Sequence, residues 1–245
     1  MQKHFFFDLD NTLTPSKSHI ESAHVPLLQK LCERAHVVVV SGHGEQDIRK
    51  HLAPVSDFFV LGQNGNRAVL KDGTVLWNRA LSVDKKAAAL AFITEAREEL
   101  KRTGVVTEVQ NENDIVEDRE SQIAFSLIGH HLDQSLKNAF DPDFMKRRTL
   151  MAAMTKGGAL KRLNDGGVEA RIAGTTNIDL FELGKNKGFN VGAFIEKMSW
   201  LKDECLYIGD ALFPGGNDET VVGVIPTQPV KDYRDTYAFI QANLL

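Results

Sequence analysis

The segment HFFFDLD, residues 4–10, constrains the fold more than any other part of the chain. Its aromatic run is typical of a strand buried on both faces, yet it ends in Asp8 and Asp10. Side chains two residues apart on a strand point to the same side, so both carboxylates would crowd one place. Each would raise the pKa of the other unless a positive group lay between them. The segment therefore predicts a buried strand whose end requires a cationic partner.

An alternation of strands and helices follows this segment. HVVVVSG and DFFVLG predict two more buried strands, and helical stretches at roughly 21–34 and 44–53 precede them. Such an alternation is typical of a parallel α/β sheet with right-handed crossovers. NGNRAVLKDGTVLW then predicts a hairpin with Asp72 and Gly73 in its turn.

The pattern changes after residue 83. An amphipathic helix, DKKAAALAFITEAREELKR with Asp84 as its N-cap, precedes VVTEVQ, DIVEDR and SQIAFSLIG, which predict strands of antiparallel type. Helical sequence interrupted at Gly157 and Gly158 comes next, followed by the strands VEARIAG and TNIDLFEL. This part is therefore expected to be an α+β module.

The parallel pattern resumes at Lys187, with a helix near 191–198, the strands ECLYIGD and VVGVIP, and a last helix from Asp232. We therefore expect an α/β core domain made of residues 1–83 and 187–245. An inserted α+β domain would occupy residues 84–186. A chain of 245 residues is long enough for this arrangement.

Composition and charge exclude several classes of function. The formal net charge of -4 gives no basic surface for nucleic acid, and no apolar run approaches the ~20 residues of a membrane helix. The first residues lack the regions of a signal peptide. Cys32 and Cys205 are far apart and without metal-type spacing, so two buried free thiols are expected. These features predict a cytoplasmic protein that binds neither nucleic acid nor a membrane.

Polar residues gather at the ends of three predicted core strands. Ligands of open α/β sheets bind beyond the carboxyl ends of the strands, so these residues should converge. Several acids at one point need a cation, and an all-oxygen set favours a hard ion such as Mg²⁺. The residues concerned are Asp8, Asp10, Ser41, Gly42, Gly209 and Asp210, with Asn217 and Asp218 on the following loop.

Together these motifs resemble the haloacid dehalogenase (HAD) superfamily of phosphoryl-transfer enzymes. The resemblance rests on DLDNT, the strand ending in Ser41, Lys187 before a helix, and GD…ND, which occur in the family's order. It is greatest for the Cof-like branch, and there for the eukaryotic-type phosphomannomutases and their bacterial relatives. The implied fold is a Rossmann-like parallel core with an inserted type-2 α+β cap.

The resemblance also implies roles for the core residues. Asp8 would be the nucleophile that becomes an aspartyl phosphate, and Asp10 the general acid and base. Ser41 with Gly42, and Lys187, would bind the phosphoryl group. Lys185 competes for the role of Lys187, but NKG matches the family motif better. The implied Mg²⁺ site consists of Asp8, Asp10 through its carbonyl, Asp210, Asn217 and Asp218.

The cap segments bear on the reaction. A mutase must hold a second phosphate, usually with arginines. Aligned with the phosphomannomutases, the chain keeps Arg119 but has His130 where a second arginine stands, and Asn177 and Asp179 fall at sugar-contacting positions. We therefore favour a phosphatase of phosphorylated sugars or similar small metabolites, with a phosphomannomutase as the alternative. The resemblance also implies a homodimer formed through the cap.

Two other interpretations of the same residues carry less weight. A receiver-like switch would use a phosphoaspartate, but it would be half this length and would have no alcohol for Asp10 to protonate. The histidines His43, His130 and His131 suggest a metal site, yet no third ligand has suitable spacing. They are expected to be surface or substrate-facing side chains.

Overall fold

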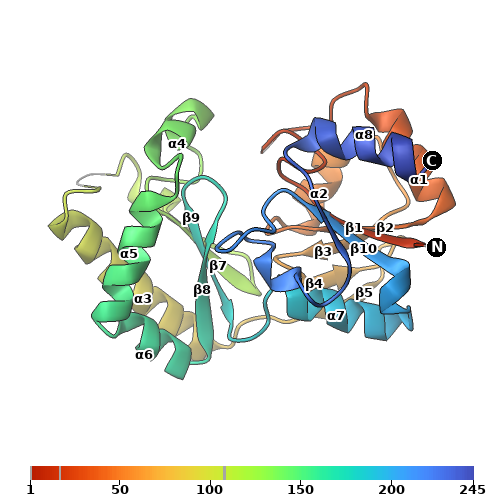
Figure 1. Ribbon diagram of the computed structural model, residues 1–245. Helices are drawn as coiled ribbons and strands as arrows, with labels where there is room; N and C mark the ends of the chain where they lie inside the picture. The colour runs from red at the N-terminus through yellow and green to blue at the C-terminus, as the bar shows by residue number, and fades with distance from the viewer. Residues whose placement is uncertain (1, 17, 107–108) are drawn as a thin grey trace. The chain divides into compact units, whose positions relative to one another are not determined.

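The computed structural model describes residues 2–16, 18–106 and 109–245 (Figure 1). The chain folds into two compact units. The core unit combines the chain up to Arg79 with the segment from Lys185 to Leu245, and the cap unit is Ala80–Gly184. The inserted unit thus begins at Ala80 rather than at residue 84, and it ends at Gly184 rather than at residue 186.

The core unit contains a seven-stranded sheet of order β11-β10-β1-β2-β3-β4-β5. The strands from β11 to β3 are parallel, and β4 and β5 add an antiparallel hairpin at one edge. The strands are β1 (His4–Asp8), β2 (His36–Val40), β3 (Phe59–Gly62), β4 (Arg67–Val69), β5 (Val75–Asn78), β10 (Cys205–Gly209) and β11 (Thr227–Pro229).

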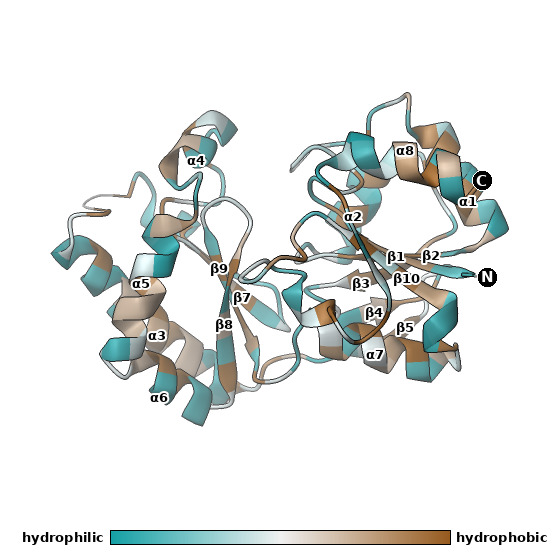
Figure 2. Ribbon diagram, viewed as in Figure 1, coloured by the Kyte–Doolittle hydropathy of each residue, from teal (hydrophilic) through white to brown (hydrophobic). Residues whose placement is uncertain are grey.

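Helices cover both faces of this sheet, which explains why β1 is apolar at consecutive positions. Phe5 and Phe7 pack with residues of α1 (Val25–Arg34), α2 (Glu45–Leu52) and α8 (Tyr233–Asn243), whereas Phe6 packs with residues of α7 (Lys187–Met198). Figure 1 shows α1, α2 and α8 on one side of the sheet and α7 on the other. In Figure 2 these helices carry both hydrophobic and hydrophilic residues, as expected of helices with one buried side.

The last strand of the core lies further along the chain than expected. Residues 221–226, VVGVIP, were expected to form it, but Gly223 has a φ of +86° and a bridge joins Val222 to Ile225. This turn ends extended structure there, and β11 begins at Thr227. The core unit also contains two short helices, η2 (Lys202–Glu204) before β10 and η3 (Glu219–Val221) before this turn.

The cap unit contains a four-stranded antiparallel sheet of order β6-β7-β9-β8. The strands are β6 (Val116–Asp118), β7 (Gln122–Ser126), β8 (Val168–Ala173) and β9 (Asn177–Glu182). The short helix η1 (Glu112–Asp114) precedes β6. The expected strand at 105–110 includes residues 107 and 108, which lie outside the described part, and the described residues of that segment form no strand.

Helices pack on one face of the cap sheet. Alternate strand residues such as Ile123, Phe125 and Leu180 join a hydrophobic cluster with α3 (Val83–Arg102), α5 (Met145–Lys156) and α6 (Ala159–Asp165). Helix α4 (Gln134–Phe140) completes the unit. The N-cap of α3 is Ser82, whose hydroxyl accepts a hydrogen bond from Lys85 N, and not Asp84 as expected. Because successive strand residues point to opposite faces, the face of the cap sheet away from these helices can carry polar side chains.

A buried ion pair fixes the turn between β8 and β9. Arg147 and Asp141 are both fully buried, and Arg147 Nε donates to Asp141 Oδ2 at 2.7 Å. Arg147 Nη1 donates to the carbonyl oxygens of Ala173 and Gly174 at 2.8 Å each, and to that of Asn177 at 3.2 Å. The start of β9 is therefore held by a charged side chain from α5.

Within the described ranges, none of the helices is both long and apolar enough to cross a bilayer.

Candidate active site

Three carboxylates meet at the carboxyl-terminal edge of the core sheet. One oxygen from each of Asp8, Asp210 and Asp218 lies within 4.8 Å of the others. β1 and β10 are neighbouring parallel strands, so Asp8 at the end of β1 and Asp210 directly after β10 come to the same edge. Asp218 reaches them from the loop after β10. The convergence expected from the strand ends is therefore present for these three acids.

Lys187, the first residue of α7, is a cationic partner of two of these acids. Its Nζ donates to Asp8 Oδ1 at 2.8 Å and to Asp218 Oδ1 at 2.6 Å, and the side chain is 1% exposed. Burial acts to lower the pKa of Lys187, but the carboxylates of Asp218 and Asp8 outweigh it and raise that pKa. The lysine is therefore charged. Lys185 instead lies over the ring of Phe189, 3.8 Å from its centroid.

Two glycines allow the close approach of these segments. A Cβ at Gly188 would lie 1.8 Å from the carbonyl oxygen of Thr220, so only glycine lets the start of α7 approach η3. A Cβ at Gly209 would lie 2.3 Å from Asp218 Oδ2. The glycines of the motifs NKG and GD are therefore required by the close packing around the acid cluster as well as by the turns.

Asp218 is the most enclosed of the three acids. It is fully buried, and its Oδ1 accepts hydrogen bonds from Lys187 and from the Tyr207 hydroxyl at 2.8 Å. Its Oδ2 has no hydrogen-bond partner among the residues that the structure describes. A buried carboxylate oxygen without a donor fits a cation ligand. Asn217, its neighbour on the same loop, is exposed.

The electrostatics of Asp8 and Asp210 also fit a bound cation. Burial raises the pKa of Asp8 despite the opposing charge of Lys187, and Asp218 and Asp210 add to the rise. Burial and the Asp218 charge raise the pKa of Asp210 to about 6, while Lys187 opposes them. Asp210 Oδ1 accepts a hydrogen bond from the Thr12 hydroxyl at 3.3 Å. A divalent ion would favour the ionised form of every member, and the all-oxygen set suits Mg²⁺.

Asp10 lies apart from this acid group, contrary to the expectation that Asp8 and Asp10 crowd one place. β1 ends at Asp8, and Asn11 has a φ of +57°, so the two-residue repeat of a strand does not extend to Asp10. The Asp10 Oδ2 lies 3.0 Å from Nε2 of His43. His43, expected to be a surface or substrate-facing side chain, therefore contacts a predicted catalytic residue.

Ser41 and Gly42 follow β2 at the same edge of the sheet. Ser41 is 2% exposed, and its Oγ accepts a hydrogen bond from His43 N at 3.2 Å. Its carbonyl oxygen accepts from Asn64 N at 2.8 Å. Val40, the last residue of β2, pairs in register with Asp8, the last residue of β1. Ser41 is therefore the first residue beyond these paired strand ends. The loop that carries Ser41 and Gly42 is thus anchored beside the strand that ends in Asp8.

In the cap unit, two of the four predicted substrate residues meet at a third side chain that the motifs did not single out. Arg119 Nη2 donates to Glu117 Oε2 at 2.5 Å. His130 Nδ1 lies 3.8 Å from the same oxygen, and His130 Nε2 lies 3.2 Å from the carbonyl oxygen of Ala124. Burial lowers the pKa of His130 although Glu117 acts to raise it. The arginine therefore has a carboxylate partner already, and the histidine is neutral at neutral pH.

The other two residues stand on β9. Asp179 pairs with Ala124 of β7, which in turn pairs with Glu117 of β6. The three positions form one row across the sheet, on the face opposite to the helices. Asn177 is two residues away and faces the same side; it is 7% exposed, and its Oδ1 accepts from the Thr176 hydroxyl at 3.2 Å. Asn177 and Asp179 thus lie on the same face of the cap sheet as Glu117, the side chain that Arg119 and His130 contact.

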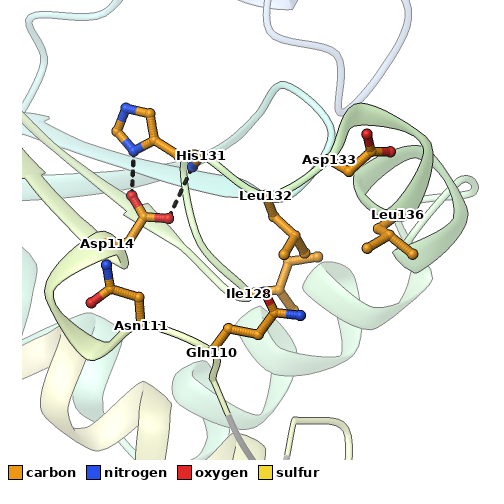
Figure 3. A pocket seen from close by; sticks show the side chains of 8 residues that line it. All are labelled: Gln110, Asn111, Asp114, Ile128, His131, Leu132, Asp133 and Leu136. Carbon is orange, nitrogen blue, oxygen red and sulfur yellow. Dashed lines mark hydrogen bonds and ion pairs between the residues drawn. The ribbon is translucent and has the colours of Figure 1, made fainter.

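A separate pocket of about 480 Å³ lies within the cap unit (Figure 3). Figure 3 shows His131 hydrogen-bonded to Asp114 on one side and the side chains of Ile128, Leu132 and Leu136 on another. Its lining also includes Gln110, Asn111 and Asp133. None of the predicted substrate residues lines it.

The chain belongs to the haloacid dehalogenase-like hydrolases, since the model of that family matches residues 5–218. Phosphomannomutase 2 of Dictyostelium discoideum is 26% identical over 225 residues, which are 86% of this chain and 83% of that protein. These findings confirm the resemblance to the HAD superfamily and its Cof-like branch. Enzymes of this family generally use Mg²⁺, which agrees with the donor set of the acid cluster.

Solved structures share the fold of this chain. The N-terminally truncated IMP-nucleotidase of Plasmodium falciparum has a TM-score of 0.69 at 14% identity, over 100% of this chain and 71% of that one. A phosphatase of the HAD enzyme superfamily from Bacteroides thetaiotaomicron has a TM-score of 0.63 at 16% identity, over 98% and 94%. At these identities the structures show the fold alone, an α/β core with an inserted cap.

Proposed function

We propose that this protein is a Mg²⁺-dependent phosphatase that acts through an aspartyl phosphate on phosphorylated sugars or similar small metabolites. The observation that carries the proposal is Lys187 Nζ, buried within hydrogen-bonding distance of both Asp8 and Asp218. A charged lysine beside the nucleophile neutralises the approaching phosphoryl oxygens, which suits a reaction governed by positioning and electrostatics.

In the first step, an Asp8 carboxylate oxygen forms a bond to phosphorus and the ester P–O bond breaks. The departing alkoxide takes its proton from Asp10. In the second step, Asp10 accepts a proton from water, which attacks the aspartyl phosphate and releases inorganic phosphate. Both carboxylates are then back in their starting forms. Ser41 and Gly42 supply hydrogen bonds to the phosphoryl oxygens.

Asp8, Asp210, Asp218 and the Asp10 carbonyl would hold the Mg²⁺ ion, which supplies charge neutralisation to the phosphoryl group when bound. The orphaned Oδ2 of Asp218 supports this assignment. Asn217 is exposed on the loop and would lie at the solvent-facing side of this ion site.

The contacts of the cap favour a phosphatase over a mutase. A mutase needs cations for a second phosphate, but Arg119 is already bound to Glu117 and His130 is neutral. Binding a second phosphate at this place would bring an anion to a carboxylate. Sugar hydroxyls can use the same groups without that repulsion, together with Asn177 and Asp179. These polar side chains of the cap therefore favour a substrate whose part distal to the reacting phosphate is uncharged.

Phosphomannomutase activity is the second candidate, and the 26% identity with a phosphomannomutase favours it. The two candidates predict different products. A mutase isomerises a hexose phosphate, depends on a hexose bisphosphate and releases little phosphate.

The test is a screen of phosphate release with Mg²⁺, using a chromogenic ester, mannose and glucose phosphates, and nucleoside monophosphates, which the IMP-nucleotidase fold neighbours suggest. We expect stoichiometric phosphate release from at least one sugar phosphate without a bisphosphate activator. Isomerisation that needs the activator would favour the mutase. Absence of turnover on every ester in the presence of Mg²⁺ would refute both.

A further inference from the structure

We propose that His43 is a positioning residue for Asp10, holding the carboxyl group of the general acid through one hydrogen bond in both halves of the reaction. This inference rests on the proposed function. It deepens that function by assigning a role to a histidine that none of the motifs includes.

The contact itself is direct. His43 Nε2 lies 3.0 Å from Asp10 Oδ2, and the two side chains are 19% and 29% exposed. An ionised carboxylate has only acceptors, so this hydrogen bond places a proton on Nε2 of His43. With Oδ2 engaged by the histidine, the other oxygen of Asp10 is the one that exchanges a proton with the leaving group and with water. The same N–H can donate to Oδ2 whether or not Asp10 carries that proton.

The backbone of His43 is fixed on two sides, which makes the side chain a rigid support. His43 N donates to Ser41 Oγ at 3.2 Å, and its carbonyl oxygen accepts from Gln63 N at 2.9 Å. A Cβ at Gly62 would lie 3.1 Å from that carbonyl oxygen, so β3 packs closely against the loop. The segment is therefore held by the same strand ends that carry the phosphoryl site.

The imidazole ring is also fixed. The ring of His51, in the last turn of α2, packs edge-on against it, with centroids 5.3 Å apart and an interplanar angle of 81°. A ring held by packing on one side and by a carboxylate on the other has little freedom to rotate. His43 can therefore fix the rotamer of Asp10, which follows the end of β1.

The consequence is a change in leaving-group dependence. A misplaced general acid slows the departure of a strongly basic alkoxide or phenoxide much more than that of p-nitrophenoxide, which leaves with little protonation. The value of kcat/KM reports the transfer to Asp8 and not the later hydrolysis of the aspartyl phosphate. Phenyl phosphate and p-nitrophenyl phosphate have nearly the same shape, so the cap treats them alike.

The experiment measures kcat/KM for these two esters with Mg²⁺ in the wild type and in His43→Ala, His43→Asn and His43→Gln. We expect His43→Ala to lose about 10- to 100-fold on phenyl phosphate, the worth of one hydrogen bond to a charged group, and only a few-fold on p-nitrophenyl phosphate. Glutamine places an N–H donor near the position of Nε2, so His43→Gln should recover most of the loss. The shorter amide in His43→Asn should not.

His131→Ala serves as the control, because His131 is 90% exposed and its side-chain contact is with Asp114 of the cap unit. Thermal unfolding of each variant checks that the fold is intact. Equal losses on both esters, or no recovery in His43→Gln, would overturn the role of His43 while leaving the phosphatase proposal standing. A wild type inactive on these two esters and on every other ester of the screen would overturn the proposed function and the role of His43 with it.

Discussion

The Nζ of Lys187 lies 2.8 Å from Oδ1 of Asp8, and both side chains are almost completely buried, at 1% and 5% exposed. A charge of each sign is thus removed from water at one point, and Asp218 adds a second carboxylate. Neither ion is stable there without the other, because desolvating a lone charge costs several kcal/mol. The site is therefore held together by the same charges that are proposed to react.

Replacement of this lysine should destabilise the protein. Lys187→Met leaves the buried carboxylates of Asp8 and Asp218 without their cation, so we expect a loss of about 3–5 kcal/mol in EDTA. Urea unfolding measures it. The double variant Lys187→Met with Asp218→Asn should regain much of the loss, because it removes one of the opposed charges. Equal stability of the single and double variants would contradict this account.

Asp8→Asn should abolish turnover and keep the fold, because the amide has nearly the same shape but cannot attack phosphorus. We expect kcat for phosphate release to fall at least about 10³-fold. Asp10→Asn is the matched control. It retains the nucleophile, so it should still form some phosphorylated protein from p-nitrophenyl phosphate, detectable by mass. Substantial turnover by a folded Asp8→Asn protein would remove Asp8 from its role.

The pH dependence of stability without metal should reveal Asp210. Its pKa, raised to about 6 in the folded state, lies above the ordinary value of 3.8. The stabilisation from its protonated form is therefore complete below the unfolded pKa and is lost as the pH rises through about 6. In EDTA, we expect a higher Tm near pH 5 than near pH 7.5.

Asp210→Asn is the control for this titration. It cannot ionise, so its Tm should change less over the same range and should exceed that of the wild type near pH 7.5 in EDTA. Mg²⁺ should raise the Tm of the wild type at that pH and have little effect on the variant, because binding to the folded state stabilises it. An unchanged difference in Tm between the two pH values in Asp210→Asn would assign the effect to other groups.

The cap ion pair predicts two opposite effects. Arg119→Ala should raise KM for the best sugar phosphate about 10- to 100-fold more than for p-nitrophenyl phosphate, if the guanidinium contacts the distal part of the substrate. Glu117→Gln removes the competing carboxylate, so binding of a hexose bisphosphate should become tighter. Isothermal titration measures this binding. Equal effects of Arg119→Ala on both esters would make Arg119 a structural residue.

The buried pair of Arg147 and Asp141 should matter to the stability of the cap unit. Arg147→Met removes the donors to three carbonyl oxygens and leaves Asp141 buried without its partner, at a cost of about 3–5 kcal/mol. Adding Asp141→Leu should recover part of that loss, because the buried charge is then gone. Chemical unfolding followed by hydrogen exchange in β8 and β9 would measure both. A double variant less stable than the single one would refute the charge argument.

Local patterns were enough to determine the class of fold and to name the three acids of the cluster, although they also included Asp10, which lies apart from it. The apolar runs ending in Asp8, Ser41 and Asp210 predict parallel strands covered on both faces, because only such strands are apolar at consecutive positions. Their polar ends then meet at one edge by the geometry of the sheet. The alternating strands of the insertion predict an antiparallel sheet for the same kind of reason.

Contacts between distant segments were decided only by the tertiary structure. Only the family motif favoured Lys187 over Lys185, and the structure brings Lys187 into the cluster. The sequence does not show that Asp218 turns inward while Asn217 faces solvent. Nor does it show that Tyr207 binds Asp218 or that Glu117 holds Arg119. His43 and Asp10 are 33 residues apart, and their meeting depends on where β1 ends and how the loop after β2 is anchored. Sequence patterns report periodicity and composition, which fix each element, whereas the direction of a side chain beyond a strand's end depends on backbone turns and on neighbours brought close by folding.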